Sequence, residues 1–370
     1  MDAARACALL ARTPSLTAEH VRALVAHCGS LQHAAQPDLH RLAEVELPHA
    51  ARAFLAAPDR EAIDADLKWI ASSGAALIPC TSAEYPPLLA HTERAPPVLY
   101  VLGRVDALSS TQIAIVGSRT ASAGGLDTAR EFATHLARAG FTVTSGLALG
   151  IDSAAHEAAL AADGLTIAVC ACGLDRVYPR RHVRLAARIR ERGALVSEFP
   201  PRTEPRAQHF PQRNRIISGL ALGTLVVEAA LTSGSLITAR HALEQGREVF
   251  AVPGSIHNPL ARGCHLLIRD GATLVESAGE LLAGLPNFLH LQSLAQASAT
   301  RGGGAETARV LDKDYEMLLD ALGFEPASID VLVARTGLPG ESIASMLLIL
   351  ELQRRVAPHP GGRYSSVPRR

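Results

Sequence analysis

Between Gln112 and Val275 the chain alternates short apolar runs, often β-branched, with longer stretches in which apolar positions recur at helical spacing. The runs that predict strands are 113–116, 141–144, 165–170, 195–197, 224–227, 249–252 and 273–275, and the clearest helical stretches are 126–139 and 153–162. Continuous apolar strands separated by helices are typical of a mostly parallel sheet covered on both faces. The pattern predicts a Rossmann-like, doubly wound α/β domain at 106–285.

The N-terminal flank of this domain follows another pattern. Residues 1–65 form short Ala-rich helical stretches, broken at Thr13-Pro14-Ser15 and Gly29-Ser30, with no strand pattern. We expect a small all-α module there, of the SAM-like or helix-hairpin-helix-like kind. Residues 66–105 contain repeated prolines, which cannot donate to helices or to strand ladders. They predict an extended connector that packs on the core.

The C-terminal flank begins with a polar stretch, 286–308, which ends in Arg301-Gly302-Gly303-Gly304 and predicts a flexible linker. Helical patterns follow at 309–322, 328–335 and 339–354. The end, 356–367, carries Pro360-Gly361-Gly362, which suits a hairpin turn. Three helices followed by a β-hairpin are the layout of a winged helix, which we place at 309–370.

The distribution of charge along the chain is more informative about binding partners than the net charge. The 36 Lys and Arg residues balance 36 Asp and Glu residues, so the whole chain shows no bias toward a polyanion. The segment from Arg176 to Arg215, however, is rich in arginine and contains only Glu191, Glu198 and Glu204 as acids. A polyanion-binding surface explains this segment. A solvated helix face at 184–192 explains part of it equally well.

Several classes of protein are disfavoured by what the sequence lacks. The six cysteines are scattered, without a C-x-x-C pair or clustered histidines, which fits neither a disulfide framework nor a zinc site. We therefore expect reduced thiols, no metal and no cofactor. The sequence shows no signal-peptide pattern and no apolar run long enough to cross a bilayer. It predicts a soluble, cytoplasmic protein without a membrane partner.

Three strand ends carry small or glycine-rich loops. Gly117-Ser118-Arg119 follows the first strand, Ser145-Gly146 ends the second, and Ser233-Gly234-Ser235 precedes a helix that contains Thr238. Where a parallel strand meets a helix N-terminus, exposed N–H groups and the helix dipole favour phosphate. Arg119 adds a permanently charged, forked donor. Each loop alone would pass as an ordinary turn, but three on one sheet edge predict a phosphate-binding pocket.

Three further residues near these loops are assigned structural roles. Asp152, or Ser153, is placed as the N-cap of its helix, and His156 one turn later is expected to pair with Asp152 to hold the loop. Glu228 ends a strand beside the third loop and is the one credible general base. Because there is no G-x-S-x-G elbow and no pair of poised acids, we expect no catalytic residues and assign Glu228 to the loop structure.

The most distinctive stretch runs from His209 to Leu220. Pro211 suits the first turn of a helix, so Arg213, Asn214 and Arg215 are expected near its start. Phe210 is one of few aromatic residues in the chain. An exposed ring there would stack a base, whereas a hydrophobic staple at the helix start explains it equally well.

Together these motifs resemble the DNA-processing protein A family (DprA, also called Smf). The resemblance is carried by 117–119, 145–156, Gly173 with Asp175, Tyr178-Pro179, 197–199, 210–220 and 233–239, and it extends to 85–89, 97–100 and 252–254. It covers about 80–280 strongly. It implies a homodimer that binds and protects single-stranded DNA and loads the recombinase RecA during natural transformation, with single-stranded DNA-binding protein as a further candidate partner.

By this resemblance Arg119 matches a phosphate-binding arginine, Phe210 a base-contacting aromatic, and Arg213 and Asn214 pocket donors. Many members carry a lysine near 207–208, where the nearest cation here is Arg206. The residues predicted to contact DNA are Gly117, Ser118, Arg119, Ser145, Gly146, Arg206, His209, Phe210, Arg213, Asn214, Arg215, Ser233, Gly234, Ser235 and Thr238.

Two rival functions remain open on the sequence. The strand end at Glu228 loosely resembles nucleotide-hydrolysing phosphoribohydrolases, although their Gly-Gly-x-Gly-Thr loop is replaced here by 232–235. A duplex-binding regulator would use the winged helix. Its expected recognition helix, 339–354, is mainly apolar with cations only at its end, which is poor for a major groove.

Overall fold

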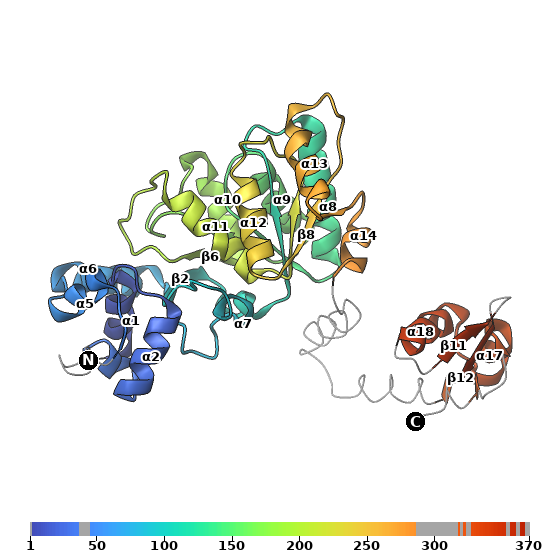
Figure 1. The fold of residues 1–370 in the computed structure, drawn as a ribbon, viewed down its shortest axis with the longest axis horizontal. Helices are drawn as coiled ribbons and strands as arrows, with labels where there is room; N and C mark the ends of the chain where they lie inside the picture. The colour runs from blue at the N-terminus through green and yellow to red at the C-terminus, as the bar shows by residue number, and fades with distance from the viewer. Residues whose placement is uncertain are drawn as a thin grey trace. The chain divides into compact units, whose positions relative to one another are not determined.

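The computed structural model describes residues 2–36, 45–285, 317–318, 321–322, 327–352, 356–359 and 363–366. The chain forms two compact units, unit 1 at Met1–Phe288 and unit 2 at Leu289–Arg370. The predicted linker at 286–308 lies outside the described residues, as do the glycine turn at 360–362 and most of the helix expected at 309–322. Figure 1 shows the element labels used below.

Unit 1 begins with helices and continues with alternating strands and helices. Its N-terminal helices are α1 (Ala3–Arg12), α2 (Ala18–Cys28), α3 (Leu31–Ala34), α5 (His49–Ala56) and α6 (Arg60–Ser73). Its strands are β1 (Ala76–Pro79), β2 (Val98–Gly103), β3 (Gln112–Val116), β4 (Thr142–Ser145), β5 (Thr166–Val169), β6 (Ala194–Ser197), β7 (Gly223–Val226), β8 (Glu248–Ala251) and β9 (Thr273–Leu274). Its other helices are α7 (Pro87–Ala90), η1 (Val105–Ser109), α8 (Ala123–Arg138), α9 (Ile151–Ala161), η2 (Arg180–His182), α10 (Val183–Arg192), α11 (His209–Leu220), α12 (Ser235–Glu244), η3 (Pro259–Ala261), α13 (Arg262–Arg269) and α14 (Ala278–Ala283).

The nine strands form one sheet in the order β1-β2-β6-β5-β4-β3-β7-β8-β9. The pairs from β6 to β9 are parallel, whereas β1 with β2 and β2 with β6 are antiparallel. After β3 the chain adds β4, β5 and β6 on one side and then places β7 on the other side of β3. Such a switch point leaves a crevice beyond the carboxyl ends of the strands, where ligands bind in doubly wound sheets.

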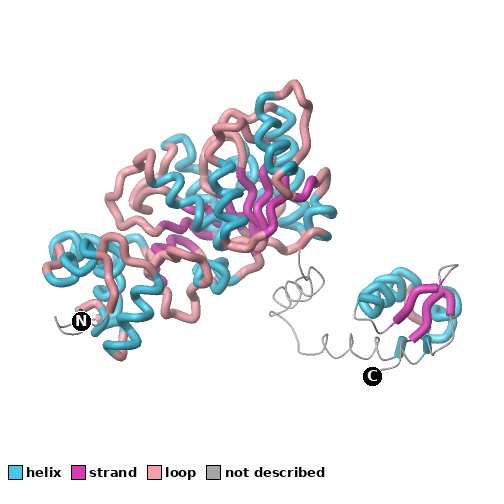
Figure 2. Tube along the Cα trace, in the orientation of Figure 1, coloured by secondary structure: helices cyan, strands magenta, loops and turns pink. Residues whose placement is uncertain are grey.

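Alternate residues of the central strands enter different cores. Ile113 and Ile115 pack with α8, α9 and α14, whereas Ala114 and Val116 join the cluster that contains the buried face of α11. Figure 2 shows the strands of unit 1 as an inner layer with helices beside them. Two buried faces explain why the strands lack apolar-polar alternation. The predicted doubly wound, mostly parallel α/β fold is confirmed.

The proline-rich segment differs from its prediction. It was expected as an extended connector, but it supplies β1 and β2, which extend the parallel sheet in antiparallel sense. Pro79 tolerates this position because β1 is an edge strand, where a missing donor costs no ladder bond. The boundary drawn at residue 65 falls inside α6, and residues of α1 and α2 share one apolar core with β2.

In unit 2 the described elements are β10 (Ala327–Ser328), α17 (Ile329–Thr336), α18 (Gly340–Leu352), β11 (Val356–His359) and β12 (Arg363–Ser366). The three strands form a sheet in the order β10-β12-β11, with antiparallel pairing throughout. Leu332, Ile343, Leu347 and Val356 belong to its apolar core. Helices that pack on a small hairpin sheet agree with the predicted winged helix.

The structure also bears on membrane spans and on the reactivity of the cysteines. Within the part of the chain that the structure describes, no helix is both long and apolar enough to cross a membrane. All six cysteines are free and buried, and burial raises the pKa of Cys170 to about 12. A thiol with so high a pKa stays protonated at neutral pH and is a poor nucleophile.

Candidate functional site

A cavity of about 520 Å³ lies at the switch point of the sheet. Its walls come from the loop after β3, the loop after β4, the start of α11 and the loop that leads into α12. We call it the loop pocket, and its lining includes Gly117, Ser118, Arg119, Thr120, Ala148, Asp152, Ala207, Phe210, Pro211, Arg213, Asn214, Thr232, Ser233, Gly234, Ser235, Thr238 and Leu260. The structure therefore brings together the first and third predicted loops and the Phe210 helix start.

Two glycines let the first two loops touch. A Cβ added at Gly150, which has φ +76°, would lie 2.2 Å from the carbonyl oxygen of Ser118. One added at Gly117 would lie 2.6 Å from the Ile151 side chain. Contacts this close leave no room for a Cβ at either position. The loop pocket thus depends on Gly150, a residue that the sequence analysis did not place in the site.

Arg119 is exposed and lies over the ring of Phe210, with its Cζ 5.0 Å from the ring centroid. Phe210 also contacts Tyr178, at 5.6 Å between ring centroids and 57° between planes. Arg119 forms no ion pair with any residue that the structure describes. A cation held on a ring at the mouth of a cavity remains available to an anion. Sequence reasoning assigned Tyr178 no role in the site, and the structure places its ring against Phe210.

Arg213 lines the same cavity but has its own partners. Its side chain is buried, and its Nη1 donates to the carbonyl oxygens of Gly146, at 2.6 Å, and Val169. Its Nε donates to Asn214 Oδ1 at 3.2 Å. Burial lowers the pKa of this guanidinium below its ordinary value. Arg213 therefore joins the ends of β4 and β5, and its predicted DNA contact is not needed to explain its position.

The third loop is connected to α11 through Asn214, whose Nδ2 donates to the Gly234 carbonyl oxygen at 3.2 Å. Ser233 and Ser235 share a hydroxyl contact at 2.7 Å, and the Ser235 amide donates to Ser233 Oγ. The amides of Arg119 and Gly234 have no hydrogen-bond partner among the described residues. Free amides of this kind suit phosphate oxygens.

The expected pairing of Asp152 with His156 is wrong. Asp152 Oδ2 accepts from the amides of Gly146 and Ala148, at 3.1 and 3.2 Å, because the loop after β4 folds back over the start of α9. Burial raises the pKa of Asp152, and the nearby Arg213 opposes this. The N-cap of α9 is Gly150 and not Asp152 or Ser153.

His156 instead points into the sheet. Its Nδ1 lies 2.6 Å from Thr166 Oγ1, which itself donates to the Val143 carbonyl oxygen. Burial lowers the pKa of His156 to about 3, so the imidazole is neutral at physiological pH. The structure thus gives His156 a different partner, Thr166, from the Asp152 that was expected.

The carboxylate of Glu228 is hydrogen-bonded at the start of helix α8. It accepts from the Ser122 amide at 2.9 Å, from Ser122 Oγ at 2.6 Å and from Asn258 Nδ2 at 3.3 Å. Ser122 is the N-cap of α8. These hydrogen bonds occupy the carboxylate and hold the end of β7 to the start of α8.

Arg215 was predicted to face DNA with Arg213, but the structure places it on another side of α11. It pairs with Glu198, and both are nearly buried. Helical geometry explains the correction, because positions two apart point in different directions. Arg215 and Glu198 line a separate cavity of about 1010 Å³ with Arg12, Gln212 and Gln245, which we call the paired cavity.

Four other predicted residues lie outside the lining of the loop pocket, among them Gly146, whose carbonyl oxygen accepts from Arg213. Ser145 is buried and donates to the Ile115 carbonyl oxygen at 2.6 Å. His209 is buried with its ring stacked on Phe199, at 4.4 Å between centroids. Arg206 is exposed on the preceding loop. Their roles toward DNA stay predictions.

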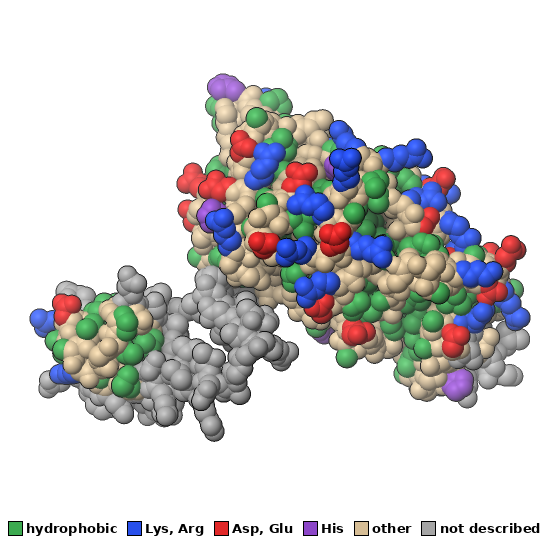
Figure 3. All heavy atoms as spheres, turned by 180° about the vertical axis from the view of Figure 1, so that it is seen from behind, with side chains coloured by type: hydrophobic (Ala, Val, Ile, Leu, Met, Phe, Trp, Pro, Cys, Tyr) green, Lys and Arg blue, Asp and Glu red, His purple; other side chains and the backbone are tan. Residues whose placement is uncertain are grey.

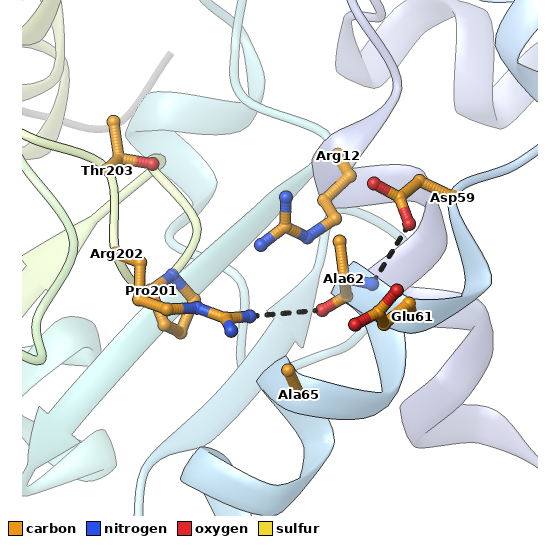
Figure 4. A pocket seen from close by; sticks show the side chains of 8 residues that line it. All are labelled: Arg12, Asp59, Glu61, Ala62, Ala65, Pro201, Arg202 and Thr203. Atoms are coloured by element: carbon orange, nitrogen blue, oxygen red, sulfur yellow. Dashed lines mark hydrogen bonds between the residues drawn. The ribbon is translucent and has the colours of Figure 1, made fainter.

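A third cavity, of about 390 Å³, separates α6 from the loop at 201–203 (Figure 4). It exposes guanidinium groups of Arg12 and Arg202, but both donate to the buried carboxylate of Asp66, at 2.5 and 3.2 Å for the closest atoms. Arg202 also donates to the Ala62 carbonyl oxygen. The two cations share the single carboxylate of Asp66 and stabilise the packing of α6.

Other chemistries find no support in the described residues. No group of three His, Cys, Asp or Glu side chains there could hold a metal ion. The face of unit 1 seen in Figure 3 mixes Lys and Arg with Asp and Glu side chains. The fold and the loop pocket define a doubly wound α/β protein with a cavity at its switch point, lined by an arginine, hydroxyl groups and loop backbone.

The family follows from comparison with known proteins. Residues 76–286 match the family described as DNA recombination-mediator protein A, and residues 304–362 match the DprA winged helix domain. The chain is 47% identical over 313 residues to Protein Smf of Escherichia coli K12, covering 84% of this chain and 83% of that protein. The chain belongs to the DNA recombination-mediator protein A family.

Solved structures agree with this assignment. DNA processing protein A from Streptococcus pneumoniae superposes with a TM-score of 0.61 at 34% identity, over 75% of this chain and 96% of that one. DNA processing protein A from Helicobacter pylori gives a TM-score of 0.51 at 26% identity, over 56% and 93%. The structure of the latter concerns its single-stranded DNA binding mode.

Proposed function

We propose that unit 1 binds single-stranded DNA in the loop pocket and presents it for recombination without chemistry on the DNA. The observation that carries the proposal is the free guanidinium of Arg119 held on the ring of Phe210 at the mouth of the cavity. Phosphates bind cations and free amides, and exposed bases stack on aromatic rings. A duplex hides its bases from such a ring, whereas a single strand offers both features.

The proposed contacts are narrower than the set predicted from the sequence. Phosphate oxygens would meet Arg119, the amides of Arg119 and Gly234, and the hydroxyl groups around Ser233. A base would meet Phe210. The relative from Helicobacter pylori, whose structure concerns single-stranded DNA binding, supports this choice of ligand. The residues proposed to form the site are Gly117, Ser118, Arg119, Phe210, Asn214, Ser233, Gly234, Ser235 and Thr238.

The absence of a catalytic step is part of the proposal. Glu228, the one candidate base, does not line the loop pocket and is engaged by Ser122 and Asn258. We therefore expect no base release from nucleoside monophosphates. Product formation that is lost on Glu228→Gln would instead support the phosphoribohydrolase alternative.

Membership of a recombination-mediator family supports the partners of the proposed function. We propose that a homodimer of this chain loads RecA onto the bound strand in the cytoplasm, during natural transformation. Displacement of single-stranded DNA-binding protein would accompany loading. Stimulation of RecA filament formation on coated DNA by the full chain tests this part independently of the pocket.

The pocket is tested by comparing Arg119→Ala with Arg138→Ala. Arg138 is also exposed, but it ends α8, whose 16 residues extend about 24 Å from the pocket edge. Both variants lose one positive charge. Arg119→Ala should weaken binding of a fluorescent oligothymidine at least tenfold, and Arg138→Ala less than twofold. Equal effects of the two variants would show that only net charge matters and would remove the loop pocket from the account.

A further inference from the structure

We propose that the bound single strand leaves the loop pocket over Tyr178 and continues along an arginine surface on η2 and α10. This arginine surface consists of Arg180, Arg181, Arg184 and Arg188. The proposal rests on the proposed function, because it extends the same bound strand beyond the pocket. It assigns a role to the arginine-rich segment that charge distribution alone left ambiguous.

The aromatic contact between Tyr178 and Phe210 supplies the connection. Tyr178 is 48% exposed, and its ring centroid lies 5.6 Å from that of Phe210. The Phe210 ring also contacts the guanidinium of Arg119. The two rings therefore extend the pocket wall outward. Successive bases of a single strand stack on neighbouring aromatic rings of this kind.

The segment that follows Tyr178 is firmly attached to the sheet. His182 Nδ1 lies 2.9 Å from the carbonyl oxygen of Leu147, in the loop after β4. The apolar face of α10 buries Leu185, Ala186 and Ile189 against the core. Arg184 and Arg188 are exposed and lie one helical turn apart on the other face. A fixed backbone places these cations without an ordering cost for the helix.

The charges of the arginine surface are uncompensated. None of its four arginines forms an ion pair with a residue in the described ranges, and the sequence from 178 to 190 contains no Asp or Glu. Neighbouring arginines differ: Arg176 pairs with Asp175, Arg190 donates to the Ser73 carbonyl oxygen, and Arg192 pairs with Asp163. Four free guanidinium groups next to an exposed ring fit a phosphate backbone with unstacked bases better than an acidic protein surface.

Two double variants on α10 test the arginine surface. Arg184→Ala/Arg188→Ala removes two free cations, whereas Arg190→Ala/Arg192→Ala removes two engaged cations from the same helix. Each is titrated with a 4-nucleotide oligothymidine, which fills the pocket only, and with a 20-nucleotide oligothymidine. For the long oligomer, the first variant should lose about tenfold in affinity, and its log-log salt slope should shrink by about 1.4. The second variant should match the wild type, and the short oligomer should bind both alike.

Tyr178 offers an independent check. Tyr178→Ala should weaken binding of the long oligomer about tenfold, and Tyr178→Phe should restore it, because the ring and not the hydroxyl stacks a base. Unchanged affinity of the long oligomer in Arg184→Ala/Arg188→Ala would overturn the arginine surface as a DNA contact. If Arg119→Ala still abolished binding of the short oligomer, the proposed function of the loop pocket would stand without the arginine surface. Failure of the wild type to bind either oligomer would reject the proposed function itself.

Discussion

Helix α11 separates two cavities that contain similar residues but differ in how their charges are used. In the loop pocket, Arg119 has no carboxylate partner among the described residues and rests on Phe210. In the paired cavity, Arg215 and Arg12 are bound by Glu198 and Asp66. The paired cavity is the larger of the two, at about 1010 Å³ against 520 Å³.

The difference shows that neither arginine content nor cavity size identifies an anion site. A buried guanidinium needs a carboxylate, as Arg215 has, or several oxygen acceptors, as Arg213 has, because a charge without partners there is strongly destabilising. Such an arginine has no capacity left for a phosphate. An exposed guanidinium that is fixed by an aromatic ring keeps its donors free. Replacing individual residues of the loop pocket tests this division between structural and binding arginines.

The largest expected effect is on stability, at Arg213. Arg213→Ala leaves the carbonyl oxygens of Gly146 and Val169 without their donor and should lower the free energy of unfolding by about 3–5 kcal/mol. Arg119→Ala should change it by less than about 0.5 kcal/mol, as expected for an exposed side chain. Urea denaturation measures both. Comparable losses in the two variants would erase the distinction between a structural and a binding arginine.

The shape of the loop pocket is tested at Gly150. Gly150→Ala places a Cβ 2.2 Å from the Ser118 carbonyl oxygen at a φ of +76°, so the free energy of unfolding should fall by about 2 kcal/mol and DNA affinity should drop. Gly124→Ala is the matched control. It lies in the first turn of α8 with only Ser122 Oγ nearby, at 3.9 Å, and should be neutral or stabilising. Equal behaviour of the two variants would mean that the loops need not touch.

Phe210 separates stacking from charge within the loop pocket. Phe210→Ala should cost about 1–3 kcal/mol of binding free energy for a single strand while leaving the salt slope unchanged. Arg119→Ala should instead lower the salt slope by about 0.7, the value for one phosphate contact. Anisotropy titrations across a salt series distinguish the two. A Phe210→Ala variant that binds like the wild type would leave the ring with only a packing role.

Per unit of pH, the smallest expected effect is a dependence of stability on pH that belongs to the core and not to either cavity. The pKa of His156 is lowered from 6.5 to about 3, so between these values the unfolded chain binds a proton that the folded chain excludes. Its contribution to stability is complete above pH 6.5 and is lost as the pH falls toward 3, at up to about 1.4 kcal/mol per pH unit. Urea denaturation at several pH values should show this slope reduced in His156→Gln and retained in the exposed control His257→Gln. An identical slope in both variants would contradict a neutral, buried His156.

Sequence reasoning predicted the sheet because continuous apolar runs report burial on both faces. It missed β1 and β2, because Pro79 and the prolines before β2 predicted a connector. Pro79 lies in the edge strand β1, which accepts it, and Pro96-Pro97 end before β2 begins. Periodicity could not foresee that Asp152 folds back to the loop amides, because that contact depends on the path of residues 146–150.

The same limit applies to the site. Spacing and residue type brought Gly117–Arg119, Phe210 and the third loop to one pocket, and the structure places them there. The sequence could not show that Arg213 and Arg215 have protein partners whereas Arg119 has none among the described residues. Those partners, Gly146 and Glu198, lie far from the two arginines in the sequence. The contact between Tyr178 and Phe210 could have been anticipated, because Tyr178 is an aromatic residue that follows a strand end. Sequence reasoning noted it only as part of a family motif.

One titration tests the central claim most directly: binding of the wild-type chain to a fluorescent oligothymidine and to a duplex of the same length, each over a series of salt concentrations. The account predicts tight binding of the single strand that weakens steeply with salt and depends little on base composition, with much weaker binding of the duplex. Equal affinity for both forms, or affinity for the single strand that does not change with salt, would contradict it.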